Sequence, residues 1–261
     1  MATVEEVEKY YEEWTERFLE VYGNVIQAYR PENTESLLDY LLESMGLFAG
    51  LELLDAGCGV CGPAIHFAEK IPLQIDAVTL SQFQVDIARK EIFRKNLESS
   101  VRVFKGDFHF LETLFPGKYF DGLYFLESLG HSDSPEKAIR SAWQVTKPGG
   151  FIYIKDFFLR ESDNVQLAAA FQKVKEEINR HYAYNVLDLH QVLSALRKTG
   201  FEIEMICKPK FANNIHIRAL FEATNGIDLY SGQAELVPAE WLEIKCRKNI
   251  YEANQRISFP A

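Results

Sequence analysis

Apolar side chains recur at helical spacing along the first 29 residues of the chain. Within Val4–Tyr29 they form one stripe that is rich in aromatic rings: Val7, Tyr10, Tyr11, Trp14, Phe18, Val21, Tyr22 and Ile26. This periodicity predicts one or two amphipathic helices. Pro31 ends them, and the run Asn33-Thr34-Glu35 begins a further helix that we expect to continue to Met45.

Short apolar runs alternate with helical segments in the next hundred residues. The predicted strands are Leu51–Ala56, Leu73–Leu80, Val101–Lys105, Phe120–Leu126 and Phe151–Lys155. The predicted helices are Ala64–Lys70, Gln82–Leu97 and Pro135–Thr146, the last of which ends at the turn Lys147-Pro148-Gly149-Gly150. Strands that alternate with helices in this way predict a parallel sheet covered on both faces.

The chain after residue 160 departs from this alternation. Residues 161–186 are predicted to form a helix with no partner strand, and a sheet-covering helix and two final strands follow. These last elements are Leu187–Lys198, Phe201–Cys207 and Trp241–Lys248, with a polar and aromatic insertion, Pro209–Pro238, between the strands. We expect the N-terminal helices and the two insertions to form a lid over the carboxyl edge of the sheet.

No linker divides the chain, and 261 residues suffice for one large α/β domain with an elaboration. We expect an N-terminal helical cap over residues 1–46 and a Rossmann-like core over residues 47–160. Residues 161–261 then supply a helical insertion and the C-terminal completion of the same domain, and the final strand is expected to be antiparallel.

Composition narrows the class of protein. Hydrophobic residues make up 47% of the chain and charged residues 25%, as in ordinary globular domains. The net charge of −10 disfavours nucleic acid as a partner, and the apolar runs are too short for a membrane span. The acidic N-terminus and four scattered cysteines predict a cytoplasmic protein with free thiols. Composition is also compatible with a homo-oligomer.

The strongest local signal is a glycine-rich loop between a strand and a helix. Gly57, Gly59 and Gly62 match the GxGxxG spacing, which lets the backbone turn tightly and approach a ligand closely. The pattern alone fits a dinucleotide as well as any other nucleoside cofactor. A turn without a ligand is the plain alternative, and the surrounding βαβ context argues against it.

Asp55, at the end of the strand before this loop, separates the two kinds of cofactor. Its carboxylate repels a pyrophosphate but attracts a cofactor that carries an ammonium group. The second strand ends at Val78-Thr79-Leu80-Ser81, without the acidic ribose anchor that dinucleotide sites use. S-adenosylmethionine, which has an ammonium, a sulfonium and no phosphate, fits these residues better than NAD(P).

Four motifs in order along the chain carry a resemblance to class I S-adenosylmethionine-dependent methyltransferases. They are Asp55-Ala56-Gly57-Cys58-Gly59, Val78-Thr79-Leu80-Ser81-Gln82-Phe83-Gln84, Gly106-Asp107-Phe108 and Lys147-Pro148-Gly149-Gly150. The second motif resembles a subgroup that contains cyclopropane fatty-acid and mycolic-acid synthases, sterol C-methyltransferases and terpenyl diphosphate C-methyltransferases. The resemblance implies a seven-stranded methyltransferase sheet.

The same resemblance assigns cofactor-binding residues one by one. Gly57, Cys58 and Gly59 form the cofactor loop with Asp55, and Thr79, Leu80 and Gln84 lie near the ribose. Asp107 binds the adenine amine and Phe108 packs on the ring. Gln27 falls where related enzymes place a polar residue near the methionine end. Many other class I enzymes carry an acidic residue at the position of Thr79, which is a departure.

Glu127, Ser128 and His131 follow the fourth strand, and the carboxyl ends of parallel strands are where open α/β sheets keep their chemistry. We predict Glu127 and His131 as catalytic residues and Ser128 as an acceptor contact. The alternatives are a solvated loop carboxylate and a helix-capping histidine. In the resembled subgroup a glutamate of this segment lies at the active site.

The aromatic stripe of the N-terminal helices supplies the other acceptor contacts, Tyr10 and Tyr22, because aromatic faces stabilise a cation. Helical spacing alone also fits simple core positions. Cys58 and Cys61 form a CxxC pair, but no second pair has ligand spacing, so we expect no metal site. Basic residues that could line a diphosphate pocket are read as surface charge.

These features together predict methyl transfer from S-adenosylmethionine to a small, hydrophobic metabolite. The resemblance favours carbon methylation of an isoprenoid or isoprenoid diphosphate, with Mg²⁺ required only if the acceptor is a diphosphate. The alternative is an O- or N-methyltransferase of a small natural product. An NAD(P)-binding oxidoreductase and a non-catalytic cofactor-binding module are the rivals from other classes.

Overall fold

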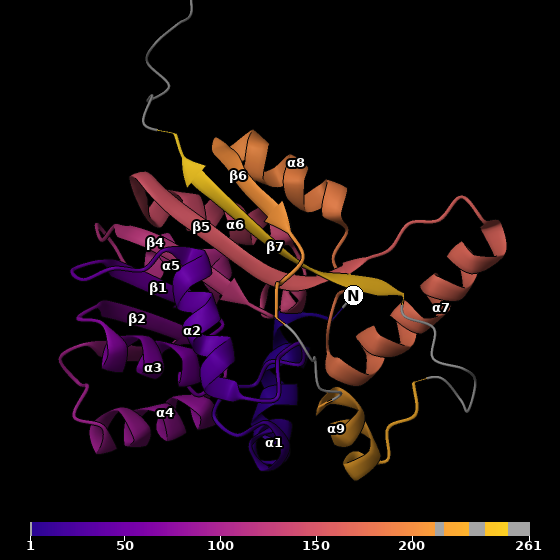
Figure 1. The fold of residues 1–261 in the computed structure, drawn as a ribbon, viewed down its shortest axis with the longest axis horizontal. Helices are drawn as coiled ribbons and strands as arrows, with labels where there is room; N and C mark the ends of the chain where they lie inside the picture. Colours follow the sequence, from indigo (N-terminus) through magenta and orange to yellow (C-terminus); the bar gives the residue numbers. More distant parts are fainter. Residues whose placement is uncertain (1, 212–216, 230–237, 250–261) are drawn as a thin grey trace, which may run out of the picture.

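The computed structural model describes residues 2–211, 217–229 and 238–249. A seven-stranded sheet with strand order β3-β2-β1-β4-β5-β7-β6 forms the centre of the molecule (Figure 1). Its strands are β1 (Glu52–Ala56), β2 (Gln74–Thr79), β3 (Val101–Lys105), β4 (Phe120–Leu126), β5 (Thr146–Leu159), β6 (Phe201–Cys207) and β7 (Ala239–Lys248). Strand β7 is antiparallel to both of its neighbours, which confirms the predicted antiparallel final strand.

Helices cover both faces of the sheet, as the alternating pattern predicted. On one face α2 (Thr34–Met45), α3 (Gly62–Lys70) and α4 (Gln82–Arg94) bury one apolar cluster. On the other face α5 (Leu111–Leu114), α6 (Pro135–Val145) and α8 (Leu189–Thr199) bury a second cluster. Successive residues Leu53 and Leu54 of β1 belong to different clusters, since side chains alternate across a strand.

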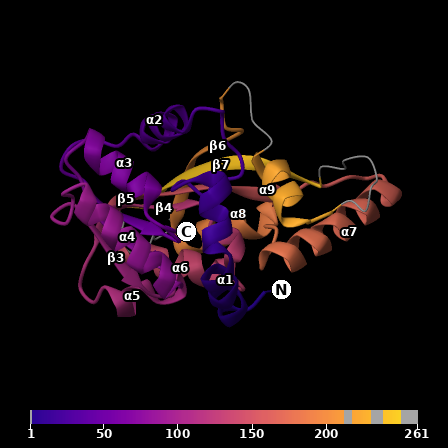
Figure 2. The ribbon, with the colours of Figure 1, turned by 90° about the horizontal axis from the view of Figure 1, so that it is seen from below.

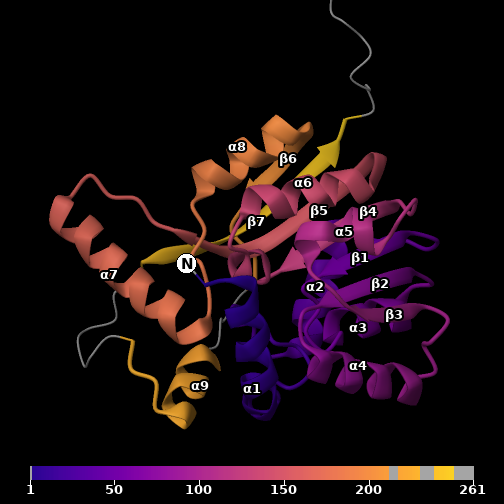
Figure 3. The same cartoon turned by 180° about the vertical axis from the view of Figure 1, so that it is seen from behind.

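The N-terminal segment forms a single helix, α1 (Val4–Tyr22), and not two. A capping box between Thr3 and Glu6 begins it, and Gly23 ends it with φ of 65°. Helix α1 lies between α4 and α9 (Ile217–Asn225), away from the centre of the sheet (Figures 2 and 3). Helix α2 instead packs with α3 in the core, although the sequence grouped it with the cap.

Strand β5 and the helix that follows it differ clearly in length from the prediction. Strand β5 begins at Thr146, and the turn expected at Lys147-Pro148-Gly149-Gly150 is an irregularity in its pairing with β4. The helix expected over 161–186 is α7 (Val165–Tyr182), which projects beyond the sheet at the end of β5 (Figure 1). Part of the insertion Pro209–Pro238 forms α9, and its residues 212–216 and 230–237 lie outside the described residues.

No helix in the described ranges is long and apolar enough to cross a bilayer.

Candidate active site

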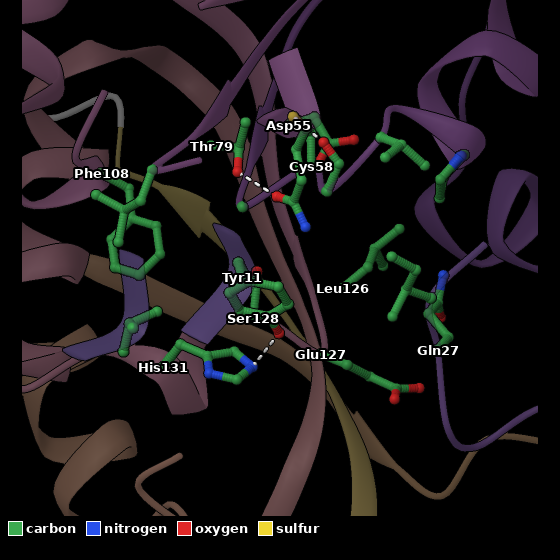
Figure 4. Close-up of a pocket in the computed structure, with 18 of the residues that line it drawn as sticks. Tyr11, Gln27, Asp55, Cys58, Thr79, Phe108, Leu126, Glu127, Ser128 and His131 are labelled. Atoms are coloured by element: carbon green, nitrogen blue, oxygen red, sulfur yellow. Dashed lines mark hydrogen bonds between the residues drawn. The ribbon is translucent and has the colours of Figure 1, made fainter. Parts of the chain in front are cut away.

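A cleft that is open to solvent lies at the carboxyl ends of the central strands. The loops after β1, β2, β3 and β4 form one side of the cleft. Helix α1 and the segment 24–27 form the opposite side (Figure 4). Nine of the predicted cofactor residues line it: Gln27, Asp55, Gly57, Cys58, Gly59, Thr79, Leu80, Gln84 and Phe108.

The glycine loop turns at the edge of β1 because its glycines have no side chain in the way. Gly57 has φ of 90°, and a Cβ there would lie 2.4 Å from Cβ of Ser128. Gly62 has a different reason, since a Cβ there would lie 2.0 Å from the backbone oxygen of Asn24. The third glycine of the motif thus lets the N-terminal segment approach the loop.

Asp55 is a buried carboxylate without a salt-bridge partner in the described structure. Burial raises its pKa to about 8, and the neighbouring Tyr124 hydroxyl only partly opposes this rise. Its Oδ2 atom has no hydrogen-bond partner among the residues that the structure describes. An ammonium group in the cleft would satisfy this carboxylate, so the residue fits the amino-acid end of S-adenosylmethionine.

The residues predicted to lie near the ribose are held by neighbours that the sequence did not reveal. The Thr79 hydroxyl donates to Oε1 of Gln84 at 2.6 Å, and Nε2 of Gln84 donates to the Thr15 hydroxyl of α1 at 3.1 Å. The predicted ribose contacts are therefore linked to each other and to the cap.

Asp107 does not itself line the cleft, although its neighbours Gly106 and Phe108 do. Burial raises the pKa of Asp107, but hydrogen bonds from the backbone and ring of His109 outweigh it and hold the net pKa below its usual value. A carboxylate in this state suits an amine donor such as the adenine amino group. With the glycine loop and the orphaned Asp55 oxygen, these residues fit S-adenosylmethionine.

Glu127 follows β4 as predicted and lines the cleft, but its carboxylate has three partners. Glu127 forms a buried ion pair with Lys155 and accepts hydrogen bonds from the backbone nitrogens of Ala28, at 2.6 Å, and Tyr29, at 3.3 Å. Its φ of 58° is unusual for a residue with a side chain. These contacts join the end of the N-terminal segment to β5, and no local sequence pattern predicts them.

His131 and Tyr11 form a hydrogen-bonded pair in the same cleft (Figure 4). The distance from the Tyr11 hydroxyl to Nε2 of His131 is 2.7 Å, and Nδ1 lies 3.0 Å from the carbonyl oxygen of Ala183. Because a carbonyl only accepts, Nδ1 carries the proton and Nε2 accepts from Tyr11. Burial lowers the pKa of His131 to about 4, so the imidazole is neutral at pH 7.

The structure separates the predicted acceptor contacts. Tyr10 and Tyr22 pack in an aromatic cluster with Phe18 and Phe221 and do not line this cleft. The helical spacing could not distinguish Tyr10 from Tyr11, and only Tyr11 reaches the cleft. Ser128 lines the cleft, but its hydroxyl donates to the backbone oxygen of Ala56 at 2.6 Å.

Cys58 and Cys61 are buried free thiols, and burial raises the pKa of Cys58 well above its usual value. Within the described ranges no group of three or more His, Cys, Asp or Glu residues is placed to hold a metal ion. The described residues that line the cleft include no lysine or arginine.

Comparison with known proteins gives one family model and many relatives. The family model described as a methyltransferase domain matches residues 54–154. A 27-O-demethylrifamycin SV methyltransferase of Amycolatopsis mediterranei is 32% identical over 191 residues, which cover 73% of this chain and 68% of that protein.

A sterol 24-C-methyltransferase of Neurospora crassa is 27% identical over 165 residues, or 63% of this chain. The match spans 43% of the length of that relative, less than half of it. Among solved structures, the 4+2 cyclase SpnF superposes with a TM-score of 0.78 and 23% identity, covering 96% of this chain and 97% of that one. This likeness shows the fold.

Proposed function

The chain belongs to the S-adenosylmethionine-dependent methyltransferases, and on that premise we propose that it methylates a hydroxyl oxygen of a small, largely apolar acceptor. The observation that carries the proposal is the Tyr11–His131 pair in the cofactor cleft. The Tyr11 hydroxyl oxygen lies 2.7 Å from Nε2 of His131. His131 follows β4, beyond the strand ends that would hold the adenosine, and Tyr11 reaches it from α1, so the pair faces the region where the methyl group would point.

The bound cofactor would supply an electrophilic methyl group on a sulfonium, with S-adenosylhomocysteine as the leaving group. Tyr11 would accept a hydrogen bond from the acceptor hydroxyl while it donates its own proton to Nε2 of His131. As the acceptor oxygen gains the methyl group, its proton passes to Tyr11 and the tyrosine proton passes to His131. Ala183 holds the imidazole in the tautomer that this transfer needs.

Glu127 takes a different role in this proposal from the one that the sequence suggested. Its carboxylate is surrounded by the ammonium of Lys155 and two backbone donors, so it is poorly placed to remove a proton from an acceptor. We propose that it holds the N-terminal segment in place. That Glu127 removes a proton during a carbon methylation stays a prediction.

The lining of the cleft supports a neutral acceptor. The apolar side chains of Val7, Ile26 and Leu126 line it, and no lysine or arginine of the described lining is available for a phosphate. Together with the net charge of −10, this favours a neutral small molecule over nucleic acid or a diphosphate. Mg²⁺ would be required only if the acceptor were a diphosphate, as the sequence suggested. The cytoplasmic location stays a prediction.

Carbon methylation of an isoprenoid-like acceptor is the second candidate. One relative is a sterol 24-C-methyltransferase, while another is named for an O-demethylated acceptor. The aromatic cluster of α1 and α9 lies next to Tyr11, and aromatic faces would stabilise a carbocation.

The test is a screen of hydroxylated natural products, sterols and geranyl diphosphate, with and without Mg²⁺, for methyl transfer from labelled S-adenosylmethionine. Mass spectrometry then places the new methyl group. With an accepted hydroxyl compound, Tyr11→Phe should lower kcat by about 10²-fold or more, since a positioned proton-transfer group is lost. Tyr10→Phe is the matched control and should retain the wild-type rate.

Two results would overturn the proposal. A methyl group found on carbon would replace it by the second candidate, and an unchanged kcat in Tyr11→Phe would remove the tyrosine from the reaction. Binding of S-adenosylhomocysteine without methyl transfer to any acceptor would favour a non-catalytic module.

A further inference from the structure

Lys155 is a fully buried lysine in the carboxyl half of β5. Its ammonium forms the ion pair with Glu127, donates to Oε1 of Gln27 at 3.0 Å, and donates to the backbone oxygen of Tyr29 at 2.8 Å. Lys155 does not line the cleft, whereas Gln27 and Glu127 do. Any influence of this lysine on a bound ligand must therefore pass through its partners.

The contact with Lys155 determines how the side chain of Gln27 is turned. An ammonium group can only donate, so the carboxamide must present its oxygen to Lys155. Its NH₂ group then faces away from the lysine. Gln27 is 2% exposed, and its Nε2 atom has no hydrogen-bond partner among the described residues. A buried donor without a partner is costly, unless a ligand supplies the acceptor.

The chemistry of the cleft indicates which ligand group would meet Gln27. Asp55 is the carboxylate that suits the ammonium of an amino-acid group, and Gln27 lines the same cleft. The amino-acid end of S-adenosylmethionine also carries a carboxylate, which accepts hydrogen bonds and needs donors. The described lining offers no lysine or arginine for it, so side-chain amides and backbone N–H groups must serve.

We propose that Lys155 is a positioning residue for cofactor binding: it turns the carboxamide of Gln27 so that the NH₂ group binds the cofactor carboxylate. Glu127 balances the buried charge, and the lysine never touches the ligand. The inference rests on the proposed cofactor site but not on the identity of the acceptor.

The experiment compares two ligands that differ at the amino-acid end. S-adenosylhomocysteine carries the carboxylate, and 5′-methylthioadenosine lacks the whole amino-acid group. Titration calorimetry gives the ratio of their dissociation constants for the wild type, Gln27→Leu and the double variant Lys155→Met/Glu127→Gln. The double variant leaves no unpaired buried charge, so it tests the orientation of Gln27 without the penalty that Lys155→Met alone would carry.

In both variants the preference for S-adenosylhomocysteine should fall roughly 10-fold or more, the loss expected for one hydrogen bond to a charged group. The affinity for 5′-methylthioadenosine should stay within about twofold of the wild type. Lys248→Met is the matched control, because Lys248 is another buried lysine, which donates to the backbone oxygens of Trp143 and Thr146 away from the cleft. Its preference should equal that of the wild type.

An unchanged preference in Gln27→Leu would remove Gln27 from carboxylate binding, and an unchanged preference in the double variant alone would remove Lys155 from its positioning. Equal weakening of both ligands would show a general structural role and also overturn the proposal. Failure of the wild type to bind either ligand would instead contradict the cofactor site itself.

Discussion

Asp55 and Glu127 are both carboxylates in the cleft, yet they have opposite surroundings. Asp55 is buried without a cation beside it in the described structure, and its pKa is raised to about 8. Glu127 has a lysine and two backbone donors around it. The unsatisfied carboxylate is therefore the one with capacity for a cationic ligand group.

The raised pKa of Asp55 predicts that cofactor binding depends on pH. Below pH 8 the free protein holds a proton on Asp55, and an ammonium group bound beside it favours the ionised form. The affinity for S-adenosylhomocysteine should therefore rise from pH 6 to pH 8, with proton release. Calorimetry in buffers of different ionisation enthalpy measures both quantities.

Asp55→Asn is the control for this pH dependence and should bind weakly with no release of protons.

The stability of the free protein should depend on pH in the opposite direction. The pKa of Asp55 is higher in the folded state than in the unfolded state. The free energy of unfolding should therefore fall as pH rises from about 4 to 8. The increase in Tm caused by S-adenosylhomocysteine should grow over the same range. A pH-independent affinity would contradict this account.

His131 gives a second prediction at the scale of the residue. Burial lowers its pKa to about 4, so its imidazole should stay neutral from pH 8 down to about pH 5, whereas an unperturbed histidine titrates near 6.5. Nitrogen-15 NMR of the histidine rings should show one ring, protonated at Nδ1, that does not titrate in this range. His131→Asn assigns the signal, and a midpoint near 6.5 would show that the ring is not buried as described.

At the scale of the element, polar side chains join the N-terminal segment to the sheet at several points. Thr15 of α1 accepts from Gln84, and Glu127 and Lys155 hold residues 27–29. Near the other end of the cap, Asn185 exchanges hydrogen bonds with the backbone of Ala2. Apolar packing orders the sheet and joins α1 to α9, and these links add polar contacts between the cap and the sheet.

The ion pair between Lys155 and Glu127 should couple the two residues energetically. Removing one partner leaves a charge buried and unpaired, so Lys155→Met should lower the free energy of unfolding by about 3–5 kcal/mol. The double variant Lys155→Met/Glu127→Gln should lose less than Lys155→Met alone. Urea denaturation of the wild type, both single variants and the double variant measures the coupling. Additive losses would show that the pair contributes no coupling.

At the scale of the whole molecule, the cleft is complete only with the cap in place. The sheet supplies the floor, and Val7, Tyr11 and the segment 24–27 supply the opposite wall. Of the described residues 2–30, only Val25 belongs to the two apolar clusters on the faces of the sheet. The core therefore has its own packing, independent of α1.

Deletion of residues 1–30 should leave a protein that unfolds cooperatively but transfers no methyl group. The deletion removes Tyr11, Gln27 and the wall of the cleft, so the affinity for S-adenosylhomocysteine should also fall. Circular dichroism, calorimetry and turnover with an accepted substrate provide the three measurements. A folded and fully active truncation would show that the cap is dispensable.

The sequence alone determined the parts of this protein that depend on local patterns. Alternating apolar runs and helical segments predicted the sheet with helices on both faces, and the order of the elements placed Glu127 and His131 after β4. The glycine spacing with Asp55 predicted the cofactor loop, because a tight turn and a strand-end carboxylate are encoded within a few residues.

Only the tertiary structure decided which side chains act together. Tyr11 meets His131 across 120 positions of sequence, and Gln27 meets Lys155 across 128. The choice between Tyr10 and Tyr11 depends on the rotation of α1 against the sheet, which the periodicity of one helix does not fix. The partners of Glu127 are two backbone nitrogens and a distant lysine, and neither the identity nor the spacing of these residues encodes such contacts. They arise because packing of the cap brings segments that are remote in sequence to the same strand end.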